Sequence, residues 1–133
     1  MSFTLKTFST RPGQRGPILA AKAWLILVSH AKAGRPVTYT QLADLVGMGQ
    51  TANTITNNAV IYITAYCDLN GLPPLNAIVC SRDAGKPGEG TPDPVSMFRV
   101  FEFDWYDVCP PSPKALRAAR KAYFNEPDDE DAD

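Results

Sequence analysis

The sequence predicts a small α+β domain, and three observations support this prediction. Apolar residues recur at helical spacing in several segments, a short β-branched run lies between them, and a glycine-rich loop follows that run. A length of 133 residues with 44% hydrophobic content suits one compact domain with a buried core. The predicted order is a helix, a helix-turn-helix, a short strand with a wing, and a C-terminal helix, which describes a winged-helix-like domain.

Charge divides the chain into a basic arm over residues 1–16, one domain over residues 17–125 and an acidic tail over residues 126–133. The cations of the arm are Lys6, Arg11 and Arg15. The tail holds six of the 14 acidic residues, so residues 1–125 hold 13 basic and 8 acidic side chains, a net charge of +5. We expect the arm to be flexible and the self-repelling tail to be disordered. The tail either keeps the chain soluble or covers a basic face in competition with a polyanion.

Turn signals divide the first half of the domain into three predicted helices. Pro17 suits the first turn of a helix, and apolar spacing continues this helix until a Gly-x-Pro sequence ends it. Thr38 or Thr40 can cap a short second helix, because its side-chain oxygen accepts a hydrogen bond from a free amide of the first turn. A turn with two glycines follows, and a long third helix is predicted over about residues 52–70.

The second half begins with a predicted strand over residues 77–80, which read Ala-Ile-Val-Cys. Residues 83–94 contain three glycines and three prolines and are predicted to form a loop. Residues 97–106 fit both a strand and a helix, and the spacing of methionine, phenylalanine and tryptophan at every fourth position favours a helix. A serine followed by a proline begins the last predicted helix, over residues 112–124.

Residues 34–47 read Gly-x-Pro-Val-Thr-Tyr-x-x-Leu-Ala-x-x-x-Gly. This pattern resembles the start of the helix-turn-helix in the C-terminal domain of DNA alkyltransferases and their alkyltransferase-like relatives. In that family a long helix, a Leu-Pro connector, a strand with the active site and a glycine-containing wing follow. Leu72-Pro73, residues 78–82 and residues 83–85 occupy these places here. The resemblance covers about residues 34–90 and implies a winged helix that binds DNA.

The active-site sequence of the repair enzymes in that family is absent. Those enzymes carry Pro-Cys-His-Arg, whereas residues 76–82 of this chain read Asn-Ala-Ile-Val-Cys-Ser-Arg. A reactive thiolate needs a lowered pKa, and Arg82 is the one cation close to Cys80 in the sequence. We therefore expect a buried structural cysteine and no enzyme activity. The family also inserts an arginine of the long helix into the base stack, and residues 52–70 contain no arginine.

Two sets of residues are candidate contacts to nucleic acid. Uncharged polar side chains at the start of the long helix either meet base edges, where asparagine pairs with adenine, or form a solvated surface. Cations elsewhere would meet phosphates. The candidate base contacts are Asn53, Thr54, Thr56, Asn57 and Asn58. The candidate phosphate contacts are Lys6, Arg11 and Arg15 in the arm, Arg82 and Lys86 in the wing, and Lys114, Arg117 and Lys121 on the last helix.

Two functions remain open at this point. The first is non-enzymatic binding of nucleic acid, preferably DNA, with modulation by the acidic tail. The second is a protein-interaction module, such as a small adaptor or an inhibitor of a larger nucleic-acid machine from a mobile element, because no Lys or Arg lies between Arg35 and Arg82. We expect no cofactor, no metal site and no membrane segment, since the chain has one histidine, three widely spaced cysteines and no long apolar run. An N-terminus without a signal-peptide core predicts a cytoplasmic protein.

Overall fold

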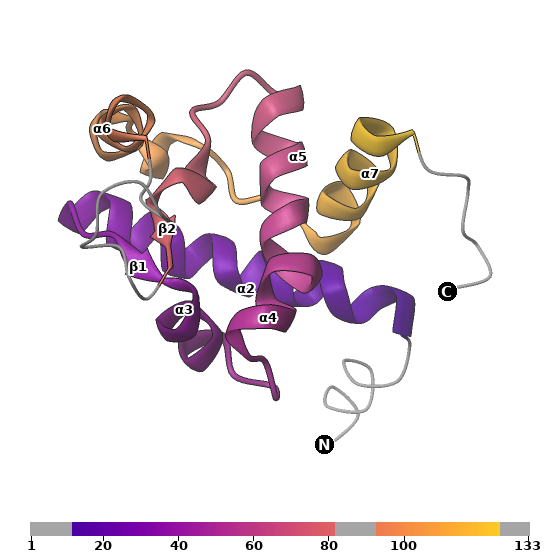
Figure 1. Ribbon diagram of the computed structural model, residues 1–133. Coiled ribbons are helices and arrows are strands. Elements are labelled where there is room, and N and C mark those ends of the chain that lie inside the picture. The colour runs from indigo at the N-terminus through magenta and orange to yellow at the C-terminus, as the bar shows by residue number, and fades with distance from the viewer. Residues whose placement is uncertain (1–11, 82–92, 126–133) are drawn as a thin grey trace, which may run out of the picture.

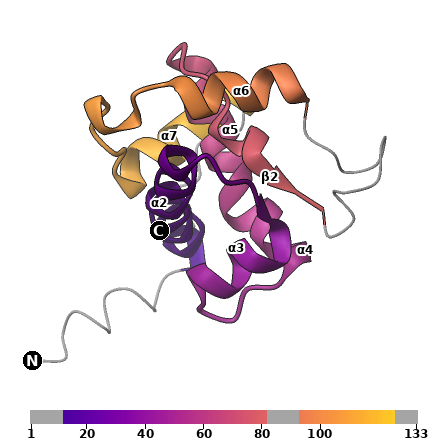
Figure 2. The ribbon, with the colours of Figure 1, turned by 90° about the vertical axis from the view of Figure 1, so that its left-hand side faces the viewer.

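The computed structural model describes residues 12–81 and 93–125, which form helices around one core together with a two-stranded sheet (Figures 1 and 2). This architecture agrees with the predicted small α+β domain. The elements in chain order are α2 (Pro12–Ala33), β1 (Val37–Thr38), α3 (Tyr39–Val46), α4 (Ala52–Ile55), the π-helix η1 (Thr56–Val60), α5 (Ile61–Leu69), the 3-10 helix η2 (Leu75–Ile78), β2 (Val79–Cys80), α6 (Pro94–Glu102), the 3-10 helix η3 (Trp105–Asp107) and α7 (Pro113–Phe124).

Helix α2 begins at Pro12, so the predicted start at Pro17 is wrong by five residues. Pro17 lies inside the helix, where it removes one main-chain hydrogen bond. Pro12 also suits the first turn of a helix, and the residues before Pro17 have a tertiary contact, because Gly16 lies directly against the ring of Tyr62. Residues 12–16 are therefore helical and do not belong to a flexible arm. The rest of the predicted arm lies outside the described residues.

Thr38 caps α3, which decides between the two threonines that the sequence left open. Its hydroxyl oxygen accepts a hydrogen bond from the Gln41 amide at 3.0 Å, and the Gln41 side-chain oxygen accepts one from the Thr38 amide at 3.0 Å. This reciprocal pair satisfies two amides that the helix itself leaves without partners. The helix ends at Gly47, whose φ of 75° is a conformation that glycine adopts without strain.

The predicted long helix is present, but a π-helical turn interrupts its regular winding. Helix α4, the π-turn η1 and helix α5 follow one another without a break from Ala52 to Leu69. A π-turn accommodates one more residue than an α-helical turn, so it rotates the side chains on one side of it relative to those on the other. The polar residues of α4 and the apolar residues of α5 can therefore face different surroundings within one continuous rod.

The sheet joins two segments that are distant in the sequence. Strand β1 pairs with β2 in parallel, with Val37 opposite Val79 and Thr38 opposite Cys80. The predicted strand is half as long as expected, because residues 75–78 form the 3-10 helix η2. A parallel pair needs a long crossover, and the helices from α3 to η2 provide it. The predicted wing would fall largely in residues 82–92, outside the described part of the chain.

The C-terminal helices follow their local capping signals. Asp93 caps α6 by accepting a hydrogen bond from the Ser96 amide at 3.2 Å, so the helical interpretation of residues 97–106 is confirmed up to Glu102. Ser112 caps α7 by accepting a hydrogen bond from the Ala115 amide at 3.1 Å. The sequence predicted the bounds of α7 correctly.

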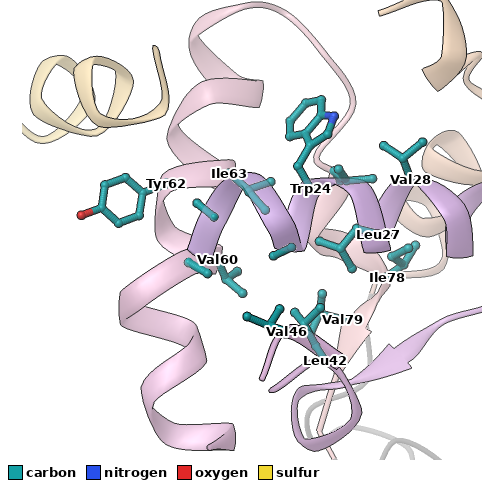
Figure 3. Packing of buried hydrophobic residues seen from close by; sticks show 14 of the residues in the cluster. Trp24, Leu27, Val28, Leu42, Val46, Val60, Tyr62, Ile63, Ile78 and Val79 are labelled. Atoms are coloured by element: carbon teal, nitrogen blue, oxygen red, sulfur yellow. The ribbon is translucent and has the colours of Figure 1, made fainter. Parts of the chain in front are cut away.

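All described helices and both strands contribute side chains to one hydrophobic cluster. Figure 3 shows part of this cluster, where side chains of α2, α3, α5 and β2 meet. Trp24 lies within it, with its ring centroid 5.6 Å from that of Tyr66 and 5.7 Å from that of Trp105, both edge to face. The indole nitrogen of Trp105 donates a hydrogen bond to the Val100 carbonyl at 2.8 Å, so this ring is buried with its N–H satisfied. Helical spacing in α3 allows Leu45 to face this core, but its side chain is 53% exposed.

Candidate nucleic-acid interface

Three of the five candidate base contacts form an exposed polar surface at the start of the long helix. The side chains of Asn53, Thr56 and Asn57 are exposed, and the structure shows no hydrogen bond from them to other described residues. Figure 1 shows this helix start at the lower edge of the molecule, beside α3. We call Asn53, Thr56 and Asn57 the α4 polar surface. It presents amide and hydroxyl groups and no charge.

The other two candidate base contacts stabilise the turn before α4. The Thr54 hydroxyl accepts a hydrogen bond from the Thr51 amide at 2.8 Å, and the Thr51 hydroxyl accepts one from the Thr54 amide at 3.3 Å. Asn58 is half-buried and donates from its amide nitrogen to the Gln50 side-chain oxygen at 3.1 Å. These bonds hold residues 50–54 in place and so fix the position of the α4 polar surface.

Two cations of α2 bind main-chain carbonyls at the end of α3 and in the turn between α3 and α4. The Lys22 ammonium donates a hydrogen bond to the Val46 carbonyl at 2.8 Å, and the Arg15 guanidinium donates one to the Met48 carbonyl. Carbonyls at the C-terminal end of a helix lack helical partners and carry partial negative charge, so cations stabilise them. We call Arg15 and Lys22 the α2 cation pair. It supplies positive charge to a region whose own sequence, residues 36–81, has none.

Arg15 was predicted to belong to the arm, and Lys22 was not among the candidate contacts. The signal that could have found the pair is their spacing of seven residues, which places two side chains on one face of a helix. That signal becomes visible only when α2 is known to begin before Arg15.

The candidate phosphate contacts on α7 lie on a different part of the molecule. Lys114 is exposed, whereas Arg117 and Lys121 are half-buried. Helix α7 packs against α5 and α2, whereas α4 packs against α3 and η1. Figures 1 and 2 both place α7 away from α4, so the structure does not bring these two sets of residues together. Arg11, Lys6, Arg82, Lys86 and the acidic tail lie outside the described residues.

The two buried cysteines, Cys67 and Cys80, do not have the properties of a nucleophile. Cys80 is buried, its thiol donates a hydrogen bond to the Val37 carbonyl at 3.6 Å, and burial raises its pKa. Burial also raises the pKa of the Cys67 thiol, to about 11. A nucleophilic cysteine needs the opposite shift, because the thiolate is the reactive species. Both residues therefore fit the expected structural role.

Thiol labelling of the native protein is expected to modify Cys109 and to spare Cys67 and Cys80. Cys109 is exposed, whereas the other two are buried with raised pKa values. With a pKa of about 11, Cys67 is a thiolate in roughly one molecule in a thousand at pH 8. Mass spectrometry after iodoacetamide treatment, with a urea-unfolded sample as control, measures the pattern. Rapid native labelling of Cys80 would show that this thiol is accessible and activated.

In the described part of the chain, no group of three His, Cys, Asp or Glu side chains lies close enough to hold a metal ion. No helix there is both long and apolar enough to cross a membrane. Comparison with protein families, with curated proteins and with solved structures found no match. The function is therefore inferred from the geometry of α3, the turn after it and α4.

Proposed function

We propose that this chain binds double-stranded DNA, without catalysis, through the start of the long helix. The proposal rests on the α4 polar surface, which is exposed at the start of the helix that follows α3 and its turn, while the α2 cation pair bonds that turn. In DNA-binding helix-turn-helix proteins, residues at the start of the second helix contact base edges in the major groove. The resemblance of residues 34–47 to alkyltransferase-like proteins supports the same placement.

The α4 polar surface and the α2 cation pair would contact different parts of the DNA. The amides of Asn53 and Asn57 each offer one donor and one acceptor, which is the pattern that pairs with the major-groove edge of adenine. The α2 cation pair lies against the turn between α3 and α4 and would contact the flanking phosphates. With about two phosphates neutralised, the logarithm of the binding constant should fall with the logarithm of salt concentration with a slope of about −2. In such a protein, base contacts would contribute more to the binding free energy than charge would.

A protein-interaction function is favoured by a different observation. Leu45 and Met48, at the end of α3 and in the turn, are 53% and 38% exposed. Apolar side chains beside the α4 polar surface suit the core of a protein interface better than they suit a phosphate backbone. The alternative is therefore an adaptor or inhibitor that binds a partner protein with this same end of the molecule.

The DNA proposal predicts that the variant Asn53→Ala/Asn57→Ala loses affinity for its preferred duplex. Duplexes selected from a random pool on the wild-type chain would serve as the probe, and fluorescence anisotropy would give the dissociation constant. Each bidentate contact to a base is worth about 1–3 kcal/mol, so the double variant should bind at least tenfold more weakly, that is by about 1.4 kcal/mol or more. Both side chains are exposed, so the fold should be unaffected.

The matched control is Lys114→Ala, which removes an exposed cation from α7 far from the α4 polar surface. We expect it to bind the selected duplex about as tightly as the wild type, within roughly 0.5 kcal/mol. Failure to select any duplex, or equal binding by the asparagine variant and the wild type, would reject DNA recognition by α4. Substituting Leu45 and Met48 would then be the next step in a search for a protein partner.

A further inference from the structure

The three side chains of the α4 polar surface lie on one face of the helix start. Thr56 and Asn57 follow Asn53 by three and four residues, so both are its neighbours on that face. Asn53 and Asn57 are separated by about 6 Å of helix rise. This rise is close to two base-pair steps of DNA, at about 3.4 Å each. The two amides are therefore spaced to meet two base pairs at the same time.

The α4 polar surface carries partners for two of the four bases. The side-chain oxygen of an asparagine accepts a hydrogen bond from the N6 amino group of adenine, while its nitrogen donates one to adenine N7. The methyl group of a threonine suits the C5 methyl of thymine. Guanine is usually bound by arginine or lysine and cytosine by aspartate or glutamate, and residues 50–60 contain none of these four residue types. The side chains of this helix start therefore match A·T pairs.

A G·C pair would leave the same amides incompletely bonded. The major-groove edge of guanine offers two acceptors, N7 and O6, so the asparagine oxygen would have no donor there. Cytosine offers one donor, its N4 amino group, and no acceptor for the asparagine nitrogen. The cations Arg15 and Lys22, whose residue types bind guanine, already donate to carbonyls of Met48 and Val46. A G·C pair at either position would therefore be bound more weakly than an A·T pair.

We propose that the α4 polar surface selects A·T base pairs through the major groove. Asn53 and Asn57 would each bind an adenine, at positions about two base-pair steps apart, and the Thr56 methyl would contact the methyl of a thymine beside them. This inference rests on the DNA-binding function proposed above and names the class of sequence that the site prefers.

Two base analogues test these contacts at single atoms. Replacing adenine with 7-deazaadenine removes the N7 acceptor, and replacing thymine with uracil removes the C5 methyl, while base pairing is kept. Duplexes selected on the full chain should contain two A·T pairs at the stated spacing. In fluorescence anisotropy, 7-deazaadenine at either adenine should weaken binding about 2–10-fold, the effect of one hydrogen bond. Uracil at the contacted thymine should weaken binding about fourfold, the effect of one buried methyl group.

Variants of the chain assign each contact to a residue. Asn57→Ala should lose the discrimination between adenine and 7-deazaadenine at one of the two positions and keep it at the other, and Asn53→Ala should show the converse. Thr56→Ser keeps the hydroxyl and removes the methyl, so it should bind the thymine and uracil duplexes equally. Asn70→Ala and Thr40→Ser change exposed residues outside the α4 polar surface and should keep both effects.

Failure of this inference can be distinguished from failure of the DNA-binding function. If binding depends on Asn53 and Asn57 but the selected duplexes carry G·C pairs at the contacted positions, A·T selection is overturned and DNA binding stands. The same conclusion holds if both analogues bind like the natural bases, because recognition would then depend on DNA shape. If no duplex is selected, or if the double asparagine variant binds like the wild type, both the DNA-binding function and this inference are rejected.

Discussion

Replacing Trp24 with alanine is expected to lower the free energy of unfolding by about 3–5 kcal/mol, the cost of removing a large buried aromatic side chain. The indole is 1% exposed and makes edge-to-face contacts with Tyr66 and Trp105. Three elements, α2, α5 and η3, would lose packing together. Since domains are usually stable by about 5–15 kcal/mol, this single change removes a large part of the total.

The matched control is Leu25→Ala, at the next position of the same helix. Leu25 is 57% exposed, so its truncation should change stability by no more than about 0.5 kcal/mol. Urea denaturation followed by far-ultraviolet circular dichroism measures both variants against the wild type. A loss below about 1 kcal/mol for Trp24→Ala would mean that the aromatic cluster does not hold the described helices together.

The elements that the sequence predicted well are those fixed by bonds between near neighbours. Asp93 and Ser112 each cap a helix through an amide three residues away, so the signal and its partner lie within one short segment. Thr38 acts in the same way, although the sequence also allowed Thr40. Local hydrogen bonds of this kind are visible without knowledge of the fold.

The features that the sequence did not show depend on contacts between distant segments. The parallel pairing of Val37 with Val79 joins residues separated by five helical elements, and no local pattern specifies it. The close packing of Gly16 of α2 against Tyr62 joins residues 46 positions apart in the sequence. The exposure of Leu45 likewise results from how α3 packs against its neighbours, because helical spacing alone allows this residue to face inward.

The residue types of the candidate interface were predictable from the sequence, but the role of each residue was not. A run of asparagines and threonines at a helix start indicated a polar surface, and Asn53, Thr56 and Asn57 are exposed as that interpretation requires. The sequence could not separate them from Thr54 and Asn58, whose partners are in the adjoining turn. The α2 cation pair stayed hidden for a related reason, since its carbonyl partners are more than twenty residues away.

Gly16→Ala is expected to destabilise the wild-type protein but to stabilise a variant that lacks the Tyr62 ring. A β-carbon at Gly16 would lie 2.7 Å from the Tyr62 hydroxyl oxygen and 2.9 Å from a ring carbon. The ring cannot move aside easily, because it is 8% exposed, its hydroxyl accepts a hydrogen bond from the Arg120 guanidinium at 3.1 Å, and the ring centroid lies 5.0 Å from that guanidinium. Such overpacking costs about 1–3 kcal/mol, which exceeds the gain of about 1 kcal/mol that alanine brings to a helix.

In a Tyr62→Ala background the same substitution should stabilise the protein, because the ring is gone and the helix propensity of alanine remains. Urea denaturation of the four proteins of this double-mutant cycle gives the coupling free energy between the two positions, expected to be about 1–3 kcal/mol. Ser29→Ala, on the exposed side of α2, reports the propensity effect without a clash. If Gly16→Ala destabilised both backgrounds equally, close packing of Gly16 on Tyr62 would not be the cause of the destabilisation.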